Sequence, residues 1–246
     1  MNAKITATAH NAPEKVMTNF DLEKLVDTSD EWIRSRTGIV QRHVVAKDEA
    51  SSDISTRIAN SLLEKSQMSP DDLDLILVGT VTPDHFTPST AALVQKNIKA
   101  NNAWGYDLSA ACSGFLFGLE TGANFIASGR YKRVMVIGVD TMTSILDFQD
   151  RDTCVIFGDG GGGVILEPTS DGNGIVDSIL HMDGSGGDYL IVPGGGSRIP
   201  ASVESVEKRK HFIKQDGKTV FKYAVKGMAD VSEKILSRNN LTGQDI

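Results

Sequence analysis

The sequence predicts an α/β fold in which helices cover a mostly parallel sheet. Two observations support this prediction: short apolar runs bounded by turn residues recur along the chain, and segments with helical periodicity alternate with them. Runs that are apolar throughout are typical of parallel strands buried on both faces. A chain of 246 residues is long enough to bury such a sheet in one large domain or in two of ordinary size.

The elements follow in order from these patterns. Strands are expected where the apolar runs are clearest, at residues 74–79, 134–139, 154–157 and 163–166. Helices are expected where apolar residues recur at helical spacing, at residues 52–66, 90–99, 113–127 and 220–239. The alternation of the two kinds of element predicts a layered architecture.

Composition and charge argue against several classes of function. The net charge of −7 argues against nucleic acid as the main partner. No stretch approaches the roughly 18 uninterrupted apolar residues of a membrane span, and the first residues lack the apolar core of a signal peptide. The two cysteines form no disulfide framework. We therefore expect a cytoplasmic protein that binds neither nucleic acid nor a membrane.

Cys112 is the most informative residue of the chain. It lies in the run 107–115, where a short apolar strand meets a helix through small side chains. Small neighbours let a substrate carbonyl approach the sulfur, and the N-terminus of the following helix favours the thiolate. A nucleophile and a buried free cysteine acting as a small hydrophobe both fit this pattern. Cys154, inside an apolar run, is predicted to belong to the core.

The helix after Cys112 carries Gly114, Gly118 and Gly122 on one face. Each glycine costs roughly 1 kcal/mol in a helix interior, so three in register indicate that another helix or a stretch of backbone approaches closely. A poorly formed helix is the alternative, but the surrounding apolar residues favour a buried central helix.

Two segments of the chain resemble each other without gaps. Residues 58–73 align with residues 231–246, with Ser69 opposite Thr242 and Asp72 opposite Asp245. A generic amphipathic helix and turn explains part of this agreement, and an internal duplication explains all of it. The first copy leads into the strand at 74–79, whereas the second ends where the matching strand would begin. We therefore expect this chain to be the front part of a longer protein with two repeats.

Glycines and histidines give weaker signals. The run 158–163 contains a G-x-G-x-x-G match, but an apolar strand follows it instead of the helix that a dinucleotide site requires. A tight strand-to-strand turn is therefore favoured there. None of the five histidines has metal-ligand spacing, so no metal site is expected. His85 follows a predicted strand and is either a base for Cys112 or, as favoured here, a loop histidine at a subunit contact.

The segment 28–39 combines Trp32 with the guanidinium groups of Arg34 and Arg36. An aromatic ring and guanidinium groups at this spacing can stack on a purine and pair with phosphate. A solvated helix whose tryptophan covers the core is the alternative.

Six stretches together resemble β-ketoacyl-acyl-carrier-protein synthase III, the initiating condensing enzyme of bacterial type II fatty acid synthesis. They are residues 28–39, 80–89, 110–115, 150–151, 156–160 and 217–222, and they occur in the family's order. The resemblance implies an α/β, thiolase-like fold of two similar halves, which agrees with the internal similarity. It places an N-terminal half with the nucleophile at residues 1–170 and an incomplete C-terminal half at residues 171–246.

The resemblance also implies the chemistry. Cys112 would accept a short acyl group from acyl-coenzyme A as a thioester, and this group would condense with malonyl-acyl-carrier protein with loss of carbon dioxide. The reaction needs a thiolate, donors for the thioester oxyanion and groups that stabilise the enolate. No cofactor is implied besides the coenzyme A thioester used as substrate, and a homodimer is expected.

The remaining site residues come from the resemblance by position. Trp32 and Arg151 match the residues that sandwich the adenine of coenzyme A. Thr28 and Arg36 match residues at the mouth of the coenzyme A site. Phe157 matches a residue lining the site, Phe221 one in the pantetheine channel, and Lys222 part of the basic patch that receives the carrier protein. Thr87 stands where many members carry a bulky apolar residue closing the acyl pocket. Its small size predicts a roomier pocket that accepts primers longer than acetyl.

The chain also departs from the family pattern. The family's catalytic histidine and asparagine lie beyond the equivalent of Ile246, so residues 1–246 by themselves are expected to be deficient in decarboxylation and condensation. Slow acylation of Cys112 needs neither group. A 3-hydroxy-3-methylglutaryl-coenzyme A synthase is disfavoured because residues 80–84 contain no glutamate. A related ketoacyl synthase of secondary metabolism, and a non-catalytic module that binds acyl-coenzyme A or acyl-carrier protein, are the alternatives.

Overall fold

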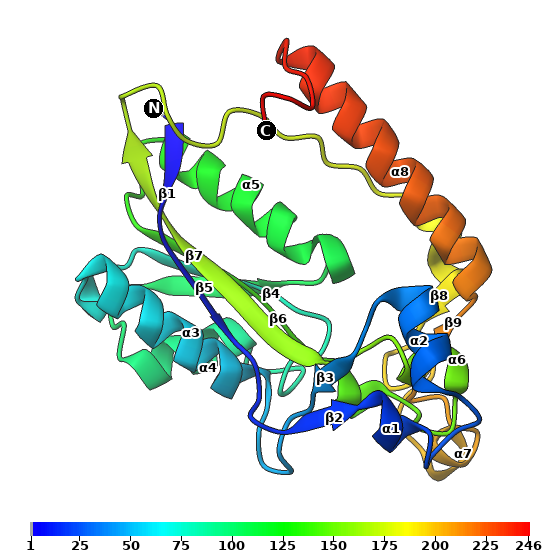
Figure 1. Ribbon diagram of the computed structural model, residues 1–246. Helices are drawn as coiled ribbons and strands as arrows, with labels where there is room; N and C mark the ends of the chain where they lie inside the picture. The colour runs from blue at the N-terminus through cyan, green and yellow to red at the C-terminus, as the bar shows by residue number, and fades with distance from the viewer. Residues whose placement is uncertain (1) are drawn as a thin grey trace. The chain divides into compact units, whose positions relative to one another are not determined.

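The computed structural model describes residues 2–246, which form two compact units (Figure 1). The first unit comprises the chain up to Met17, Gln41–Ser144 and Gly158–Val176. The second comprises Thr18–Val40, Ile145–Phe157 and Asp177–Ile246.

The first unit is built on a five-stranded sheet with the order β1-β7-β6-β4-β5. Its strands are β1 (Asn2–Asn11), β4 (Leu75–Gly79), β5 (Trp104–Leu108), β6 (Val134–Thr141) and β7 (Asp159–Thr169). Strands β4, β5 and β6 are parallel, whereas β7 runs antiparallel to both β6 and β1. The expected parallel sheet is therefore confirmed for its central strands, and β1 is a strand that the apolar pattern does not reveal.

Helices cover both faces of this sheet (Figure 1). Helices α3 (Ser51–Ser66) and α4 (Thr90–Ile98) pack on one face, and α5 (Gly114–Ala127) packs on the other. Alternate residues of β4 serve the two cores: Ile76 and Val78 face α3 and α4, whereas Leu75 and Leu77 face α5. All four side chains are fully buried, and each contributes roughly 1.5–3 kcal/mol to folding. This is why the strand is apolar throughout.

The glycine face of α5 lies against the sheet. A Cβ atom on Gly118 would lie 2.8 Å from Cγ1 of Val136, and one on Gly122 would lie 2.9 Å from Cδ1 of Leu166. A Cβ atom on Gly79 would lie 2.7 Å from the carbonyl carbon of Gly114. The close approach predicted for this helix is therefore confirmed, and the elements that approach it are the strands β4, β6 and β7.

The internal similarity extends to backbone geometry. Gln67 and Asn240, which the alignment pairs, both have left-handed backbone with φ of 55° and 54°. The following turn repeats the same hydrogen bond, from the N–H of Ser69 to Oδ2 of Asp72 at 3.0 Å and from the N–H of Thr242 to Oδ2 of Asp245 at 2.7 Å. A generic amphipathic helix does not require this agreement, so it supports duplication.

The second unit is mainly short elements and one long helix. They are α1 (Asn19–Leu22), α2 (Asp30–Thr37), α6 (Arg151–Cys154), η4 (Gly184–Tyr189), β8 (Leu190–Ile191), α7 (Val203–Glu207), β9 (Lys214–Gln215) and α8 (Gly217–Arg238). Arg209 donates to the buried Asp147, with Nε 2.8 Å from Oδ2. This hydrogen bond holds the pKa of the Asp147 carboxyl below its usual value. The short β2 (Val16–Thr18) and β3 (Gln41–His43) complete the strands.

Two sequence predictions are wrong. The run 154–157 is not a strand, because Arg151–Cys154 form helix α6, whose N-cap Asp150 accepts a hydrogen bond from the N–H of Asp152. A short apolar run does not distinguish a strand from a buried helical turn. The glycine run does not form a turn between strands either, since Asp159 already begins β7. Cys154 is fully buried, as predicted.

Candidate active site

Cys112 lies in a turn between a strand and a helix. Strand β5 ends at Leu108, the single 3-10 turn η2 covers Ala111–Ser113, and α5 begins at Gly114. The Cys112 side chain is exposed. The alternative of a buried structural cysteine is therefore excluded for Cys112, whereas it holds for Cys154.

The backbone before the sulfur is strained. Ala111 has φ of +46°, a left-handed conformation that costs a residue with a Cβ atom roughly 1 kcal/mol or more. Such strain persists where the surrounding structure holds it, and it is common at functional sites. The strained turn joins β5 to α5 and carries the exposed Cys112.

A cavity of about 400 Å³ opens beside this sulfur. The cavity is lined by residues of the turn that carries Cys112, of the first turn of α5, of the carboxyl ends of β4 and β6 and of the start of β7. They are Gly79, Ala111, Cys112, Phe115, Gly138, Val139, Asp140, Gly158, Gly160, Gly162 and Gly163. In the antiparallel register Gly138 pairs with Gly162 and Asp140 with Gly160. Glycines thus leave room beside the Cys112 sulfur. Within the described part of the chain, no histidine or asparagine lines this cavity.

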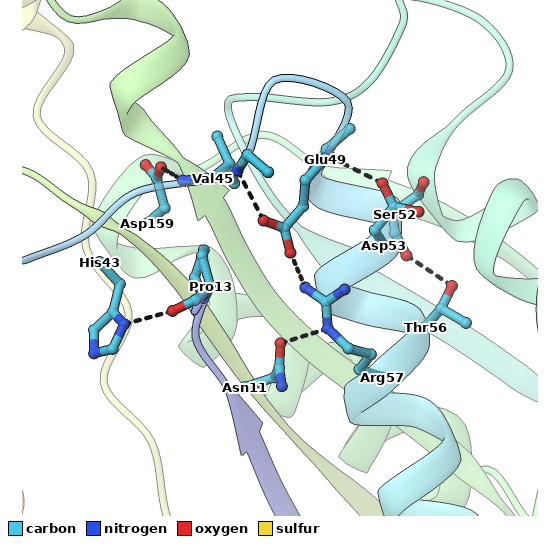
Figure 2. Close-up of polar contacts among 12 residues, drawn as sticks. Asn11, Pro13, His43, Val45, Glu49, Ser52, Asp53, Thr56, Arg57 and Asp159 are labelled. Atoms are coloured by element: carbon cyan, nitrogen blue, oxygen red, sulfur yellow. Dashed lines mark hydrogen bonds and ion pairs between the residues drawn. The ribbon is translucent and has the colours of Figure 1, made fainter. Parts of the chain in front are cut away.

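Asp159, between the cavity-lining Gly158 and Gly160, fixes neighbouring backbone, and its bond to Val45 is drawn in Figure 2. Its Oδ1 accepts from the N–H of Thr143 at 2.8 Å, and its Oδ2 accepts from the N–H of Val45 at 2.8 Å. The segment after Val45 is fastened in turn by Glu49, which accepts from the N–H of Ala46 at 3.0 Å. Asp159 itself is buried, so these bonds satisfy a carboxylate that would otherwise be costly to bury.

Arg57 of α3 extends this network toward β1. Its guanidinium forms an ion pair with Glu49, and its Nε donates to Oδ1 of Asn11 at 2.8 Å (Figure 2). Because the ion pair is partly exposed, it contributes at most about 1 kcal/mol to the free energy of unfolding. Its role is to keep the loop before α3 close to the end of β1.

Asp107, at the end of β5, holds the start of α4. Its two oxygens accept from the N–H groups of Thr90 at 2.7 Å and Ala91 at 2.8 Å. A carboxylate at a helix N-terminus satisfies unpaired donors and is stabilised by the helix dipole. Sequence analysis did not predict this role, and it did not predict that Asp140 lines the cavity. Position in the fold could have indicated both residues, since each aspartate lies near the carboxyl end of a parallel strand, where functional side chains gather.

The second unit brings two predicted residues together. The guanidinium carbon of Arg151 lies 4.2 Å from the centroid of the Trp32 ring. Oγ1 of Thr28 and Nε of Arg151 are buried and have no hydrogen-bond partner within the described residues. Buried polar groups are rarely left unpaired, so these two atoms are donors available to a ligand.

The other candidates make no comparable cluster. Phe157 is half-buried, and Arg36, Phe221 and Lys222 are exposed. Thr87 is exposed on the loop between β4 and α4, and it does not line the cavity at Cys112.

In residues 2–246, no group of metal-ligating side chains is close enough to hold an ion. The helices of this same range include none with the length and apolar character to cross a bilayer.

Comparison with known proteins agrees with this geometry. The sequence profile of 3-oxoacyl-(acyl-carrier-protein) synthase III matches residues 106–184, which contain the turn with Cys112 and β7. The chain is 56% identical over 249 residues to β-ketoacyl-(acyl-carrier-protein) synthase III of Chlorobaculum tepidum, covering 100% of this chain and 76% of that protein.

Solved structures show the same fold. The 3-oxoacyl-(acyl-carrier-protein) synthase III of Aquifex aeolicus superposes with a TM-score of 0.88 at 38% identity, over 99% of this chain and 74% of that one. The priming β-ketosynthase of a polyketide biosynthetic pathway superposes with a TM-score of 0.89 at 30% identity, over 99% and 72%. The thiolase-like fold is therefore confirmed, and the chain belongs to the β-ketoacyl-acyl-carrier-protein synthase III family.

Proposed function

We propose that this chain is an acyltransferase of fatty acid biosynthesis that joins an acyl-coenzyme A primer to malonyl-acyl-carrier protein through Cys112. The observation that carries the proposal is the exposed cysteine in a strained turn between β5 and α5, beside a glycine-lined cavity. Small neighbours give a thioester carbonyl access to the sulfur, which a structural cysteine does not need.

The reaction proceeds in two transfers. The Cys112 thiolate attacks the thioester carbonyl of acyl-coenzyme A, the carbon–sulfur bond to coenzyme A breaks, and coenzyme A leaves as a thiolate. Malonyl-acyl-carrier protein then loses carbon dioxide, and the electron pair left on its α-carbon attacks the acyl carbonyl on Cys112. The bond to the cysteine sulfur breaks, so a 3-oxoacyl product and free Cys112 result. Each tetrahedral intermediate needs hydrogen-bond donors for its oxyanion, and the resemblance assigns one of them to the N–H of Cys112. No further cofactor enters the proposal.

Trp32 and Arg151 are proposed to hold the adenine of coenzyme A. Their close approach provides a stacking surface for a planar base, and the unpaired atoms of Thr28 and Arg151 provide donors at its edge. Arg36, exposed one helical turn after Trp32, is proposed to meet the phosphates at the mouth. Phe157 and Phe221 are proposed to line the site and the pantetheine channel.

Replacing Trp32 with alanine is expected to weaken the binding of acyl-coenzyme A about tenfold, because stacking on an aromatic ring contributes roughly 1–2 kcal/mol. The acylation rate at saturating acyl-coenzyme A should stay unchanged, since the lost contact is made equally in the ground state and the transition state. Acylation rates measured over a range of acyl-coenzyme A concentrations give the half-saturation concentration and the rate at saturation separately. Ser35→Ala is the control, since Ser35 lies exposed on the same helix and its hydroxyl donates to the backbone carbonyl oxygen of Trp32. An unchanged half-saturation concentration in the tryptophan variant would remove Trp32 from the site.

Lys222 is proposed to contact the acidic carrier protein. It lies on α8 between Lys218 and Lys226, at a spacing of four residues that places the three on one helix face, and all three are exposed. Adjacent exposed lysines create a local positive field even though the chain is acidic overall.

Thr87 is proposed, on the resemblance alone, to leave the acyl pocket open for primers longer than acetyl, although it does not line the cavity at Cys112 within this chain. Thr87→Phe is expected to slow acylation by hexanoyl-coenzyme A about tenfold or more while acylation by acetyl-coenzyme A is retained, because bulk excludes extra methylenes. Rates of acylation with the two thioesters measure the effect, and Thr87→Ser is the matched control. A wild-type chain that already accepts acetyl alone would contradict the assignment.

A homodimer is part of the proposal. Strand β5 lies at the edge of the sheet with Trp104 and Gly105 exposed, and an edge strand presents unpaired backbone groups that favour pairing with another chain. Phe86, in the nearby loop after β4, is 88% exposed. A second copy on this edge would cover both features.

Two further expectations stay predictions. They are the division into thiolase-like halves at residues 1–170 and 171–246 and a cytoplasmic location.

Two alternatives are tested by one experiment. A ketoacyl synthase of secondary metabolism is supported by the likeness to the polyketide priming enzyme, and a non-catalytic binding module would use the same surfaces without transfer. Release of free coenzyme A, followed with a thiol reagent during incubation with a panel of acyl-coenzyme A thioesters, separates them. We expect one equivalent released per chain from short-chain thioesters. Binding with no release would support the module, and release from elaborate acyl groups alone would support secondary metabolism.

A further inference from the structure

The loop after β4 is held by a single carboxylate oxygen. Oδ1 of Asp140, near the end of β6, accepts from Oγ1 of Thr80 at 3.1 Å and from the N–H of Val81 at 2.9 Å. It also accepts from the N–H of Thr82 at 3.2 Å and from Oγ1 of Thr82 at 2.9 Å. Four donors from three consecutive residues thus converge on one atom, which fixes the conformation of this segment.

The same segment is bonded to the strand that leads to the nucleophile. The N–H of Thr80 donates to the carbonyl oxygen of Leu108 at 3.1 Å, and Leu108 is the last residue of β5 before the turn with Cys112. Gly79, the residue before Thr80, lies against the backbone of Gly114 at the start of α5. One end of the turn with Cys112 thus bonds to a residue that Asp140 holds, and the other end packs against the residue just before it.

Asp140 also lies on the side of the sheet that carries the site. It pairs with Gly160 across β6 and β7, and both residues line the cavity beside Cys112. Carboxylate hydrogen bonds to N–H and O–H donors are stronger than neutral ones. Removing the acceptor leaves the donors of the buried Thr80 and Thr82 unpaired, at about 1–3 kcal/mol each. The Asp140 side chain thus bonds β6 to the loop after β4, and that loop is bonded in turn to the end of β5 through Thr80.

We infer that Asp140 is a positioning residue for acyl transfer: it holds the loop after β4, and through that loop the turn that aims Cys112 at the bound thioester. The inference rests on the proposed function, in which Cys112 is the acyl acceptor. Without Asp140 the thiol stays exposed, but its geometry relative to a bound thioester relaxes. A misplacement of about 1 Å is enough to slow a positioned reaction 10- to 100-fold.

The test compares two reactions of the same thiol in the full chain. Acylation by saturating acetyl-coenzyme A needs a positioned sulfur, whereas alkylation by iodoacetamide needs only an accessible one. In Asp140→Ala we expect acylation to fall about tenfold or more and alkylation of Cys112 to stay near the wild-type rate. Asp140→Asn should restore acylation, because its amide oxygen can accept from the same donors.

Asp74 provides a matched control at the opposite end of the sheet. Its Oδ2 accepts from the N–H groups of Lys132 at 2.7 Å and Arg133 at 2.9 Å, so Asp74→Ala also removes a half-buried carboxylate that clamps backbone. It should lower the melting temperature as Asp140→Ala does, yet acylate normally.

Equal acylation rates in Asp140→Ala and Asp74→Ala would overturn the inference. An equal loss of acylation and alkylation in Asp140→Ala would also overturn it, because it would show that the thiol itself had become unreactive. The fully buried Cys154 reports the fold in the same samples, and its alkylation in Asp140→Ala would overturn the inference by showing that the variant had unfolded. A wild-type chain that is alkylated at Cys112 but never acylated would instead overturn the proposed function, and the inference with it.

Discussion

Replacing Cys112 with alanine is expected to abolish transfer of the acyl group from acyl-coenzyme A to the protein, by about 10³-fold or more. The sulfur is the atom that forms the thioester, and the only other cysteine of the sequence, Cys154, is fully buried. Binding of acyl-coenzyme A should survive, because the substitution removes one small exposed side chain. Protein-bound label from acyl-labelled thioester, after denaturation and removal of free ligand, measures the transfer.

Cys154→Ala is the matched control for this experiment. It removes the second thiol from the core, so it should lower stability by roughly 1 kcal/mol and leave acylation intact. Persistent label in Cys112→Ala, or loss of label in Cys154→Ala at a temperature where that variant is folded, would show that another group accepts the acyl chain.

The second large effect is expected at Gly79. A Cβ atom there would lie 2.7 Å from the carbonyl carbon of Gly114, 3.0 Å from its oxygen and 3.1 Å from the nitrogen of Phe115. All three are backbone atoms, so the start of α5 must shift in Gly79→Ala. We expect a loss of about 1–3 kcal/mol in the free energy of unfolding and at least about a tenfold slower acylation, since Cys112 lies two residues before Gly114. Chemical denaturation and the acylation rate measure the two effects.

Gly227→Ala is the control with the opposite expected sign. Gly227 lies inside α8, where an added Cβ atom meets nothing within 4 Å. Alanine lowers the entropic cost of a helix interior, so this variant should gain about 0.5–1 kcal/mol. Similar stability changes in the two variants would mean that the packing of Gly79 against Gly114 has no special role.

Much of the fold could be predicted from the sequence because the central strands are buried on both faces. Strand β4 carries no polar residue between Leu75 and Gly79, and a short run of this kind between turn residues is typical of a strand in the interior of a parallel sheet. The helices at 52–66 and 113–127 agree with α3 and α5 to within one residue. In contrast, β1 alternates buried and exposed residues with threonines and alanines, so its side chains carry little apolar signal.

The errors have local physical causes. The run Cys154 to Phe157 is apolar like a strand, but Asp150 caps a helical turn there, and capping by one residue outweighs a four-residue pattern. The glycines after Gly158 look like a turn, yet they pair with β6 and β1. Their small size serves close packing, because a Cβ atom on Gly163 would lie 2.9 Å from the carbonyl oxygen of Val136.

The site was only partly predictable for a related reason. Cys112 could be found locally, because small residues around a cysteine between a strand and a helix indicate access. Trp32 and Arg151 lie far apart in the chain, and residue patterns do not reveal their contact. Asp140 was missed because its role depends on four donors in a loop that follows another strand.

The central claim is that the thiol of Cys112 carries the acyl group. The most direct measurement is mass spectrometry of peptides from the chain after incubation with acetyl-coenzyme A under conditions that preserve thioesters. The account predicts one acetyl group per chain, on the peptide with Cys112, removed by hydroxylamine. An unmodified Cys112 peptide in protein that still binds acetyl-coenzyme A, or an acetyl group on Cys154 or a lysine alone, would contradict it.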